Sequence, residues 1–292
     1  MSMFPTNLPS PAQLELSDAQ MVIPPAYITH SLNGQTSAIA AHNTRAALVD
    51  TRNNAVTNIN VPGIAGKIYT AIGVLIQNKS TLTTLVPTGG LVELTCDAID
   101  WLPQQLIFNT SSAVGANAGA VQSQTWIPIH KPLPAGSNLI IFYTSQNAAT
   151  DWISVTVFYS TQPYSGAATW SNAALGTSRT AAGTYAADGT VPIPANKGGN
   201  CIGFLCQTYA QVTTVLSGGG IVQVHNQAAN TAWEPFFFCT GSNTSIGTGG
   251  SELPLLKVDA AGDCPGNSSF TFDFITISAD TQQNEYVVFW VA

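Results

Sequence analysis

The sequence contains the stretch TTLVPTGGLVEL at residues 83–94 and nearly repeats it as TTVLSGGGIVQV at residues 213–224. Each copy has two short runs of apolar and β-branched residues on either side of a glycine pair. This pattern predicts a β-hairpin in each copy. The spacing of 130 residues between the copies is too long for a solenoid repeat, so a larger unit is repeated.

The glycine pairs are predicted to supply a turn or bulge conformation that side chains would obstruct. They are Gly89 and Gly90 in the first copy, and Gly219 and Gly220 in the second. A single glycine-rich stretch could also form a ligand loop. Because it occurs twice, with Glu93 in one copy and Gln223 in the other, we interpret it as architecture.

The repeat extends well beyond this stretch. Residues 61–112 match residues 191–242 without a gap, and 17 of these 52 positions are identical, whereas this composition would give about four by chance. Two further pairs of segments match: WIPIHKPLPAG (126–136) with ELPLLKVDAAG (252–262), and DWISVTVFYS (151–160) with NEYVVFWVA (284–292). The sequence therefore predicts a tandem duplication of a unit of roughly 115 residues.

Each unit is predicted to be all-β. Runs such as VTVFY and YVVFWV are rich in β-branched and aromatic residues, and Gly, Pro, Asn and Ser clusters separate the candidate strands every 8–15 residues. This spacing favours a β-barrel or sandwich over βαβ units, and a unit of this length is a whole domain. Residues 37–49 (SAIAAHNTRAALV) could form either a short helix or another strand.

The repeat sets the predicted domain limits. We expect an N-terminal arm at 1–44, a first β-barrel at 45–163, a linker at 164–178 and a second β-barrel at 179–292. The arm contains apolar residues in places, so it is expected to pack against its own domain or a neighbour.

The charge composition excludes several function classes. Only 8% of the residues are charged, the net charge is −7, and there is no basic run. Direct nucleic-acid binding is therefore not expected, because it depends on clustered Lys and Arg. No classical secretory signal is visible, and because no run approaches 18 apolar residues, no membrane-spanning helix is expected.

The five cysteines are scattered and lack CxxC spacing: Cys96, Cys201, Cys206, Cys239 and Cys264. They are predicted to be reduced and mostly buried, acting as small apolar side chains. A disulfide from Cys201 or Cys206 to another strand remains an alternative.

No catalytic or metal-binding constellation is evident. The histidines at 30, 42, 130 and 225 do not correspond between the copies and lack metal-ligand spacing. Asp97 and Asp100 could share a loop as a carboxylate pair, but their counterparts are Gln227 and Asn230. We therefore expect no catalytic residue, no metal and no cofactor.

The tryptophans are the remaining candidates for a binding role. Trp101 corresponds to Trp233, and this shared placement indicates a packing role. Trp126 and Trp170 have no such counterpart. They are therefore the candidates for an exposed contact, such as one that stacks on a sugar ring.

Two successive barrels of similar size behind a proline-containing arm resemble the double jelly-roll major capsid proteins of icosahedral viruses with an internal membrane. The resemblance covers the architecture of the whole chain and rests on no motif. It implies two tandem, internally duplicated jelly-roll-like β-barrels that form trimers with a pseudo-hexameric outline. Unlike members of that family, this chain shows plain similarity between its two barrels, and its loops are short.

The resemblance implies a viral structural protein, the major capsid protein of an icosahedral shell, and not an enzyme. Its partners would be other copies of itself and other virion proteins, with possible contact to an internal membrane through the arm or the barrel bases. It would be located in the virion and assembled in the host cytoplasm. The alternative is a tandem β-sandwich that binds carbohydrate or a receptor, such as a virion spike or minor virion protein.

Overall fold

The structure is a computed structural model. It describes residues 30–35, 45–48, 57–80, 90–99, 101, 104–108, 122–145, 151–161, 163–210, 219–226, 236–240, 255–257, 263–276 and 282–291. These residues contain β-strands and no helix, so the all-β prediction is confirmed for them. Residues 45–47, within the stretch predicted as helix or strand, form a strand. No helix in this part of the chain is long and apolar enough to cross a membrane.

The strands of the first half, β1–β9, form two antiparallel sheets. One has the order β1-β9-β4-β7, and the other has the order β2-β8-β5-β6 with β3 also paired to β8. Their bounds are β1 His30–Gln35, β2 Arg45–Ala47, β3 Asn58–Asn60, β4 Ile68–Ser80, β5 Gly90–Cys96, β6 Gln104–Phe108, β7 Gln122–Pro134, β8 Asn138–Ser145 and β9 Asp151–Ser160.

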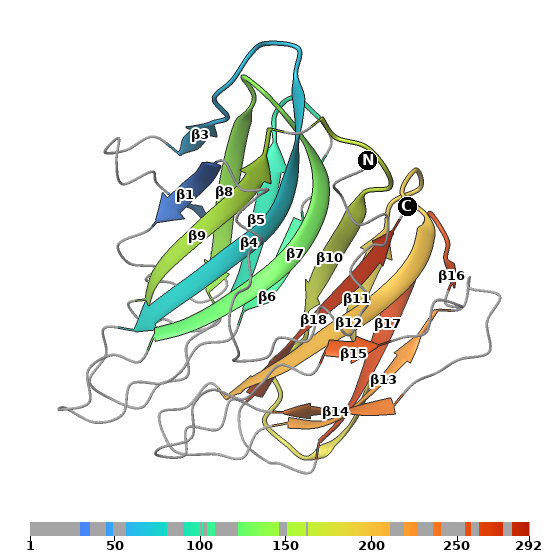
Figure 1. The fold of residues 1–292 in the computed structure, drawn as a ribbon. Coiled ribbons are helices and arrows are strands. Elements are labelled where there is room, and N and C mark those ends of the chain that lie inside the picture. The colour runs from blue at the N-terminus through green and yellow to red at the C-terminus, as the bar shows by residue number, and fades with distance from the viewer. Residues whose placement is uncertain are drawn as a thin grey trace.

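The second half, β10–β18, also forms two antiparallel sheets. One has the order β10-β18-β12-β15 with β16 also paired to β12, and the other has the order β11-β17-β13-β14. Their bounds are β10 Thr169–Leu175, β11 Gly183–Ile193, β12 Gly199–Ala210, β13 Gly219–His225, β14 Phe236–Thr240, β15 Leu255–Lys257, β16 Asp263–Cys264, β17 Ser268–Thr276 and β18 Gln282–Val291. Figure 1 shows the two halves side by side, with β10 next to β7.

The two halves have the same strand order. When β2 and β3 are counted as one strand, and β15 and β16 as another, each half has its first, eighth, third and sixth strands in one sheet. Its second, seventh, fourth and fifth strands form the other sheet. The register irregularities also agree, because a β-bulge lies between Ala71 and Gly73 in β4 and between Cys201 and Gly203 in β12. These positions are 130 residues apart.

The turns before β8 and before β17 also have the same geometry. In each turn, a serine hydroxyl donates a 2.6 Å hydrogen bond to a proline carbonyl, and the residue before the serine has a positive φ. The residues are Pro134, Gly136 and Ser137 in the first turn, and Pro265, Asn267 and Ser268 in the second.

These turns correct one part of the sequence match. The alignment of 126–136 with 252–262 places Pro134 opposite residue 260, whereas the turn geometry places it opposite Pro265. Short apolar segments of sequence align about equally well at neighbouring offsets, so the sequence alone does not fix their alignment. The hydrogen bonds of the two turns match at one offset only.

The described strands on either side of each twin glycine stretch do not pair with each other as a hairpin. β4 and β5 belong to different sheets, as do β12 and β13, so each stretch links one sheet to the other. Gly90, Gly219 and Gly220 lie within strand ladders whose register shows no shift at these positions. The prediction of turn or bulge glycines is therefore wrong at these three positions, and Gly89 lies outside the described residues.

Gly220 is needed for a different reason, which is close packing. A Cβ atom at this position would collide with the carbonyl oxygen of Ile275 on the neighbouring strand β17. The residue must therefore be small for β13 and β17 to approach each other.

The first strand of each half begins before the predicted domain limits. β1 lies in the predicted arm, 1–44, and pairs with β9. β10 lies in the predicted linker, 164–178, and pairs with β18. Both strands lie at the edge of their sheets. Their sequences mix polar and apolar residues, so the sequence pattern does not identify them as strands.

Candidate functional site: the contact between the two halves

The two halves meet at the outer face of the β10-β18-β12 sheet. Side chains alternate along β18: Tyr286, Val288 and Trp290 lie in the core of the second half, and Val287 and Phe289 lie in the core of the first. The first core therefore extends across the contact. β10 contributes Ala173 to the same cluster, and Leu175 and Ile202 pack against it.

The part of the first half that receives this face is the edge formed by β6 and β7. Lys131 of β7 is completely buried here, and its Nζ donates a 3.0 Å hydrogen bond to the carbonyl oxygen of Trp101. The Nζ atom lies 3.8 Å from the ring centroid of Trp170 and 5.5 Å from that of Trp101. The electron-rich faces of the two rings stabilise a cation that has lost its water.

The ring of Trp170 contacts a lysine ammonium group from each half. Lys131 comes from β7, and the Nζ of Lys197, which precedes β12, lies 4.1 Å from the same ring. Trp170 is only 6% exposed, so its prediction as an exposed contact is wrong. The indole lies in the core cluster of the second half, and Lys131 of the first half reaches the face of its ring. The backbone of Trp126 lies in β7, but its side chain is outside the described residues.

Hydrogen bonds before and at the start of β10 anchor this strand to the first half. The backbone N–H of His130 donates to the hydroxyl of Thr169 at 2.8 Å, and His130 Nδ1 lies 2.8 Å from the carbonyl oxygen of Ala167. The imidazole also packs against the ring of Tyr164, with the ring centroids 5.0 Å apart. His130 therefore has a structural role at the contact.

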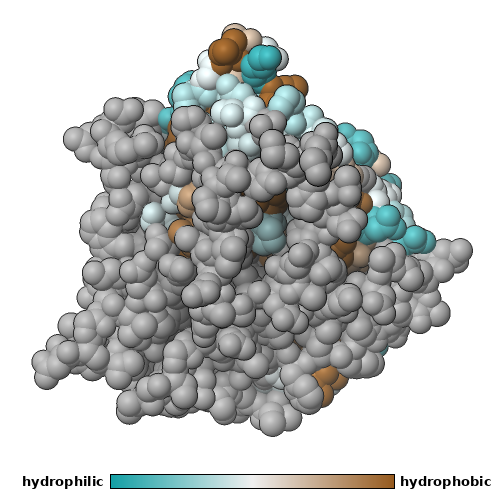
Figure 2. Space-filling view, viewed as in Figure 1, coloured by the Kyte–Doolittle hydropathy of each residue, from teal (hydrophilic) through white to brown (hydrophobic). Residues whose placement is uncertain are grey.

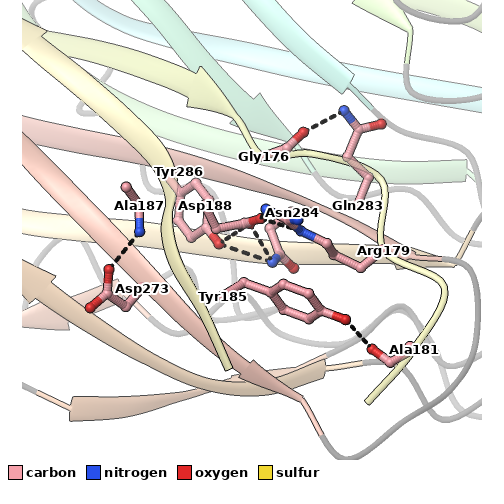
Figure 3. A network of polar contacts seen from close by, with 10 residues as sticks. All are labelled: Gly176, Arg179, Ala181, Tyr185, Ala187, Asp188, Asp273, Gln283, Asn284 and Tyr286. Atoms are coloured by element: carbon pink, nitrogen blue, oxygen red, sulfur yellow. Dashed lines mark hydrogen bonds and ion pairs between the residues drawn. The ribbon is translucent and has the colours of Figure 1, made fainter. Parts of the chain in front are cut away.

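A second cluster of polar side chains lies within the second half (Figure 3). The carboxylate of Asp188 accepts hydrogen bonds from Tyr286 at 2.6 Å, from Asn284 at 3.0 Å and from Arg179 at 2.8 Å. Gln283 donates a 2.8 Å hydrogen bond to the carbonyl oxygen of Gly176. The network therefore ties the connection between β10 and β11 to β18.

A bulge in β11 directs Asp188 into this network. The register of β11 shifts between Tyr185 and Gly189, and Ala187 within the shift has a φ of 50°. The N–H of Ala187 donates to Asp273 at 2.7 Å, which stabilises this unusual backbone conformation. His225 in turn lies 2.8 Å from the other oxygen of Asp273.

The network stabilises the second half rather than performing chemistry on a ligand. The Asp188 side chain is 0% exposed, and three surrounding side chains donate to it. A substrate therefore has no approach to the carboxylate. Among the residues that the structure describes, no group of three His, Cys, Asp or Glu side chains could hold a metal ion.

The other candidates from the sequence lie apart. Asp97 accepts hydrogen bonds from the backbone N–H and the side-chain amide of Asn138, at 2.7 and 2.8 Å. These hydrogen bonds hold the pKa of Asp97 below its usual value. Asp100 and His42 lie outside the described residues. The predicted pairing of the Asp97 and Asp100 carboxylates is therefore not tested.

The described cysteines are free thiols: Cys96, Cys201, Cys206 and Cys264. Burial raises the pKa of Cys201 and raises that of Cys264 to about 12, so both are protonated at neutral pH. A neutral, buried thiol is unreactive. Cys239 lies in β14, and its side chain is outside the described residues.

The sequence did not predict the structural roles of Lys131 and Asp188, although the pattern around Lys131 gave a weak signal. In β7, Lys131 occupies a position in phase with the apolar residues Ile127, Ile129 and Leu133. A charged residue at a core position of a strand is unusual in a chain with only 8 Lys and Arg residues. Asp188 gave no signal, because a bulge changes the face to which a residue points.

Comparisons with known proteins give only distant likenesses. No protein-family model matches the chain, and no curated protein matches it in sequence. Among solved structures, PNGF-II matches with 11% identity and a TM-score of 0.47 over 89% of this chain, which spans 65% of PNGF-II.

Two further structures are similar at a lower level. PNGase F, a glycosylasparaginase from Flavobacterium meningosepticum, matches with 10% identity and a TM-score of 0.36 over 90% of this chain and 96% of its own. The T=1 Penaeus vannamei nodavirus matches with 9% identity and a TM-score of 0.26 over 89% of this chain and 99% of its own. All three TM-scores are below 0.5, so these likenesses do not indicate a function.

Proposed function

We propose that the chain is a virion structural protein built from two tandem jelly rolls that arose by duplication. It would be the major capsid protein of an icosahedral shell and would form trimers with a pseudo-hexameric outline. The observation that carries this proposal is the identical strand order of the two halves, which pack against each other through an extended apolar contact.

The strand order supports the jelly-roll assignment. A sandwich of eight strands, with the first, eighth, third and sixth in one sheet and the second, seventh, fourth and fifth in the other, has the connectivity of a jelly roll. Shared strand order alone could arise by convergence. The bulge in β4 and β12 and the matching serine turns are local details, and they favour duplication.

A role in assembly agrees with the chemistry of the described residues. The main polar network is enclosed and the cation between the halves is buried, so both serve to fix the fold. The low charge of the chain reduces the repulsion between copies packed side by side. The proposed partners are other copies of the chain and other virion proteins. Contact with an internal membrane through the N-terminal arm or the barrel bases remains part of the proposal.

The proposal is tested by measuring the mass of the purified chain and imaging its assemblies. Native mass spectrometry is expected to show a trimer, and electron microscopy of concentrated protein is expected to show closed shells or hexagonal arrays. A chain that stays monomeric at all concentrations would overturn the proposal. Glycan binding that is lost on Trp126→Ala in such a monomer would establish the carbohydrate-binding alternative instead.

A further inference from the structure

One turn of the first half projects apolar side chains into solvent. Ile64 is 70% exposed and Ile68 is 47% exposed, and among the residues that the structure describes they are the two exposed large apolar side chains. Both lie between β3 and the start of β4, in a connection that Figure 1 shows at the top edge of the molecule. In the same view, Figure 2 shows hydrophobic surface at this edge beside hydrophilic surface. The tip of the connection therefore offers apolar surface to a partner.

Hydrogen bonds hold this turn in one shape. The N–H of Lys67 donates to the carbonyl oxygen of Ile64 at 3.1 Å, and the N–H of Ile64 donates to the hydroxyl of Tyr69 at 3.4 Å. The carbonyl oxygen of Lys67 accepts a 2.9 Å hydrogen bond from Ala135 in the turn before β8. Gly66 has a φ of 83°, a conformation that favours glycine. Both backbone polar groups of Ile64 are therefore bonded within the chain, which lowers the cost of removing them from water.

The second half contains the same turn without the apolar tip. There the N–H of Lys197 donates to the carbonyl oxygen of Pro194 at 3.1 Å, and the two turns are 130 residues apart. Pro194 takes the place of Ile64, and it is half-buried. Asn196, a polar residue, takes the place of Gly66. The fold of the turn therefore does not require an exposed isoleucine, which points to a role for Ile64 outside the fold.

The composition of the tip fits a lipid bilayer. Residues 62–68 (PGIAGKI) contain one base, Lys67, and no acid, in a chain with 15 acidic and 8 basic residues. All seven of these residues are exposed. A bilayer accepts a convex apolar tip without a matching pocket, because its acyl chains are fluid, and lipid phosphates attract an ammonium group beside the tip. The turn therefore combines aliphatic side chains with a neighbouring cation, as an interfacial anchor does.

We propose that the turn at residues 62–68 inserts into the interfacial region of a lipid bilayer. Ile64 and Ile68 contact the acyl chains, and the ammonium group of Lys67 lies at the level of the lipid phosphates. This inference rests on the proposed function, in which an internal membrane lies beneath the shell, and it assigns the contact to named residues. This end of the first half is then the base of the subunit.

The contact is expected to depend on apolar burial more than on charge. Asp97 lies at the same end of the first half, beside Asn138 at the start of β8, and it offsets the charge of Lys67. Burial of one isoleucine strengthens binding by about tenfold or more, so one tip per chain gives weak attachment. Many copies in a shell bind together, and their combined attachment is strong.

Vesicle flotation of the purified full-length chain tests the inference. The wild type is expected to float with vesicles of phosphatidylcholine, and added phosphatidylglycerol should change its recovery little. Ile64→Ser should lower the partition coefficient at least about tenfold, because it removes the most exposed large apolar side chain. Ala195→Ser is the matched control, since Ala195 is exposed on the equivalent turn of the second half. This variant should float like the wild type.

A charge at each of the two tips gives a second comparison. Ile64→Asp is expected to abolish flotation, because a carboxylate would have to leave water for the bilayer. Asn196→Asp places the same charge on the second turn and should leave flotation unchanged. Circular dichroism shows whether each variant is folded, and a folded Ile64→Asp variant that floats like the wild type overturns the inference.

The outcomes separate this inference from the function on which it rests. A wild-type chain that forms trimers or shells but does not float overturns the inference and leaves the proposed function standing. If such trimers are lost on Ile64→Ser, the turn binds another copy of the chain instead. Flotation that requires phosphatidylglycerol and disappears at high salt also overturns the inference, because charge would then drive binding. A monomeric chain that floats through Ile64 supports the inference and overturns the proposed function.

Discussion

Strands β9 and β18 hold equivalent places in the two halves, yet their surroundings differ. In β9, Val155, Val157 and Tyr159 lie in the core, and the alternate residues are half-buried. In β18, every residue from Tyr286 to Trp290 is buried, because the two faces of the strand belong to two different cores. A continuous apolar run therefore marks a strand with two covered faces, and the cover can come from another part of the same chain.

The largest expected effect comes from placing a charge at the equivalent positions of the two strands. Val287→Asp buries an unpaired carboxylate in the contact between the halves, and should cost more than about 4 kcal/mol of unfolding free energy. Thr156→Asp should change the stability of the isolated chain by less than about 1 kcal/mol, because its side chain reaches solvent. Urea denaturation followed by tryptophan fluorescence measures both. Equal losses would show that the two faces are equally covered.

The next effect concerns the network around Tyr286, whose position in β9 is taken by Val155. Asp188→Ala removes the buried acceptor that Tyr286, Asn284 and Arg179 share, and we expect a loss of about 3 kcal/mol. The measurement is the shift of the urea midpoint.

A matched control exists in the first half, where Arg45 donates to Glu93 at 2.7 and 2.8 Å. Arg45 is 48% exposed, so Glu93→Gln should cost less than about 1 kcal/mol. If the loss at Glu93 equals the loss at Asp188, burial does not determine the strength of these pairs.

The sequence predicted the strand content, because this depends on local pattern and composition. The runs VTVFY and YVVFWV lie in β9 and β18, and FTFDFIT lies in β17, where Phe270, Phe272 and Phe274 face the core. It did not predict which strands pair. The stretches at 83–94 and 213–224 have a hairpin pattern, but strands that follow each other in a sandwich often belong to different sheets.

The sequence also could not predict the contact between the halves. Trp170 has no counterpart in the repeat, a property that fits an exposed ligand contact and a buried junction equally well. Its burial depends on the packing of β10 into the core of the second half and on the approach of Lys131 from β7, which is tertiary information. Asp188 depends on a bulge, and a bulge reverses the face that simple alternation assigns.

A smaller effect should appear at alkaline pH. Burial raises the pKa of Tyr159 to about 12 from its usual 10, and its counterpart in β18, Trp290, does not titrate. Because the pKa of Tyr159 is higher in the folded chain than in the unfolded chain, the folded state is favoured fully at pH values below 10. The unfolding free energy then falls as the pH rises from 10 through 12. Tyr159→Phe should therefore flatten the decline of unfolding free energy with pH in this range. The difference between the wild-type and variant curves measures the effect, and parallel curves would contradict it.

The smallest effect is expected at the turn before β8, where the halves also differ. In the first half, Asp97 binds Asn138 through two hydrogen bonds, and in the second half Asn226 donates a 3.2 Å hydrogen bond to Ser268. The pKa of Asp97 is lowered by its hydrogen bonds with Asn138. Its stabilisation is therefore present above the usual value of 3.8 and is lost as the pH falls through the lower folded pKa.

Asp97→Asn tests this difference at the turn. Because the carboxylate is exposed, we expect the variant to lose less than about 1 kcal/mol at pH 7 and to match the wild type near pH 2. Titration of the Asp97 carboxyl carbon by NMR gives its pKa directly. A value at or above 3.8 would show that the hydrogen bonds to Asn138 do not favour the ionised form. The turn would then owe its geometry to the serine and proline that it shares with the second half.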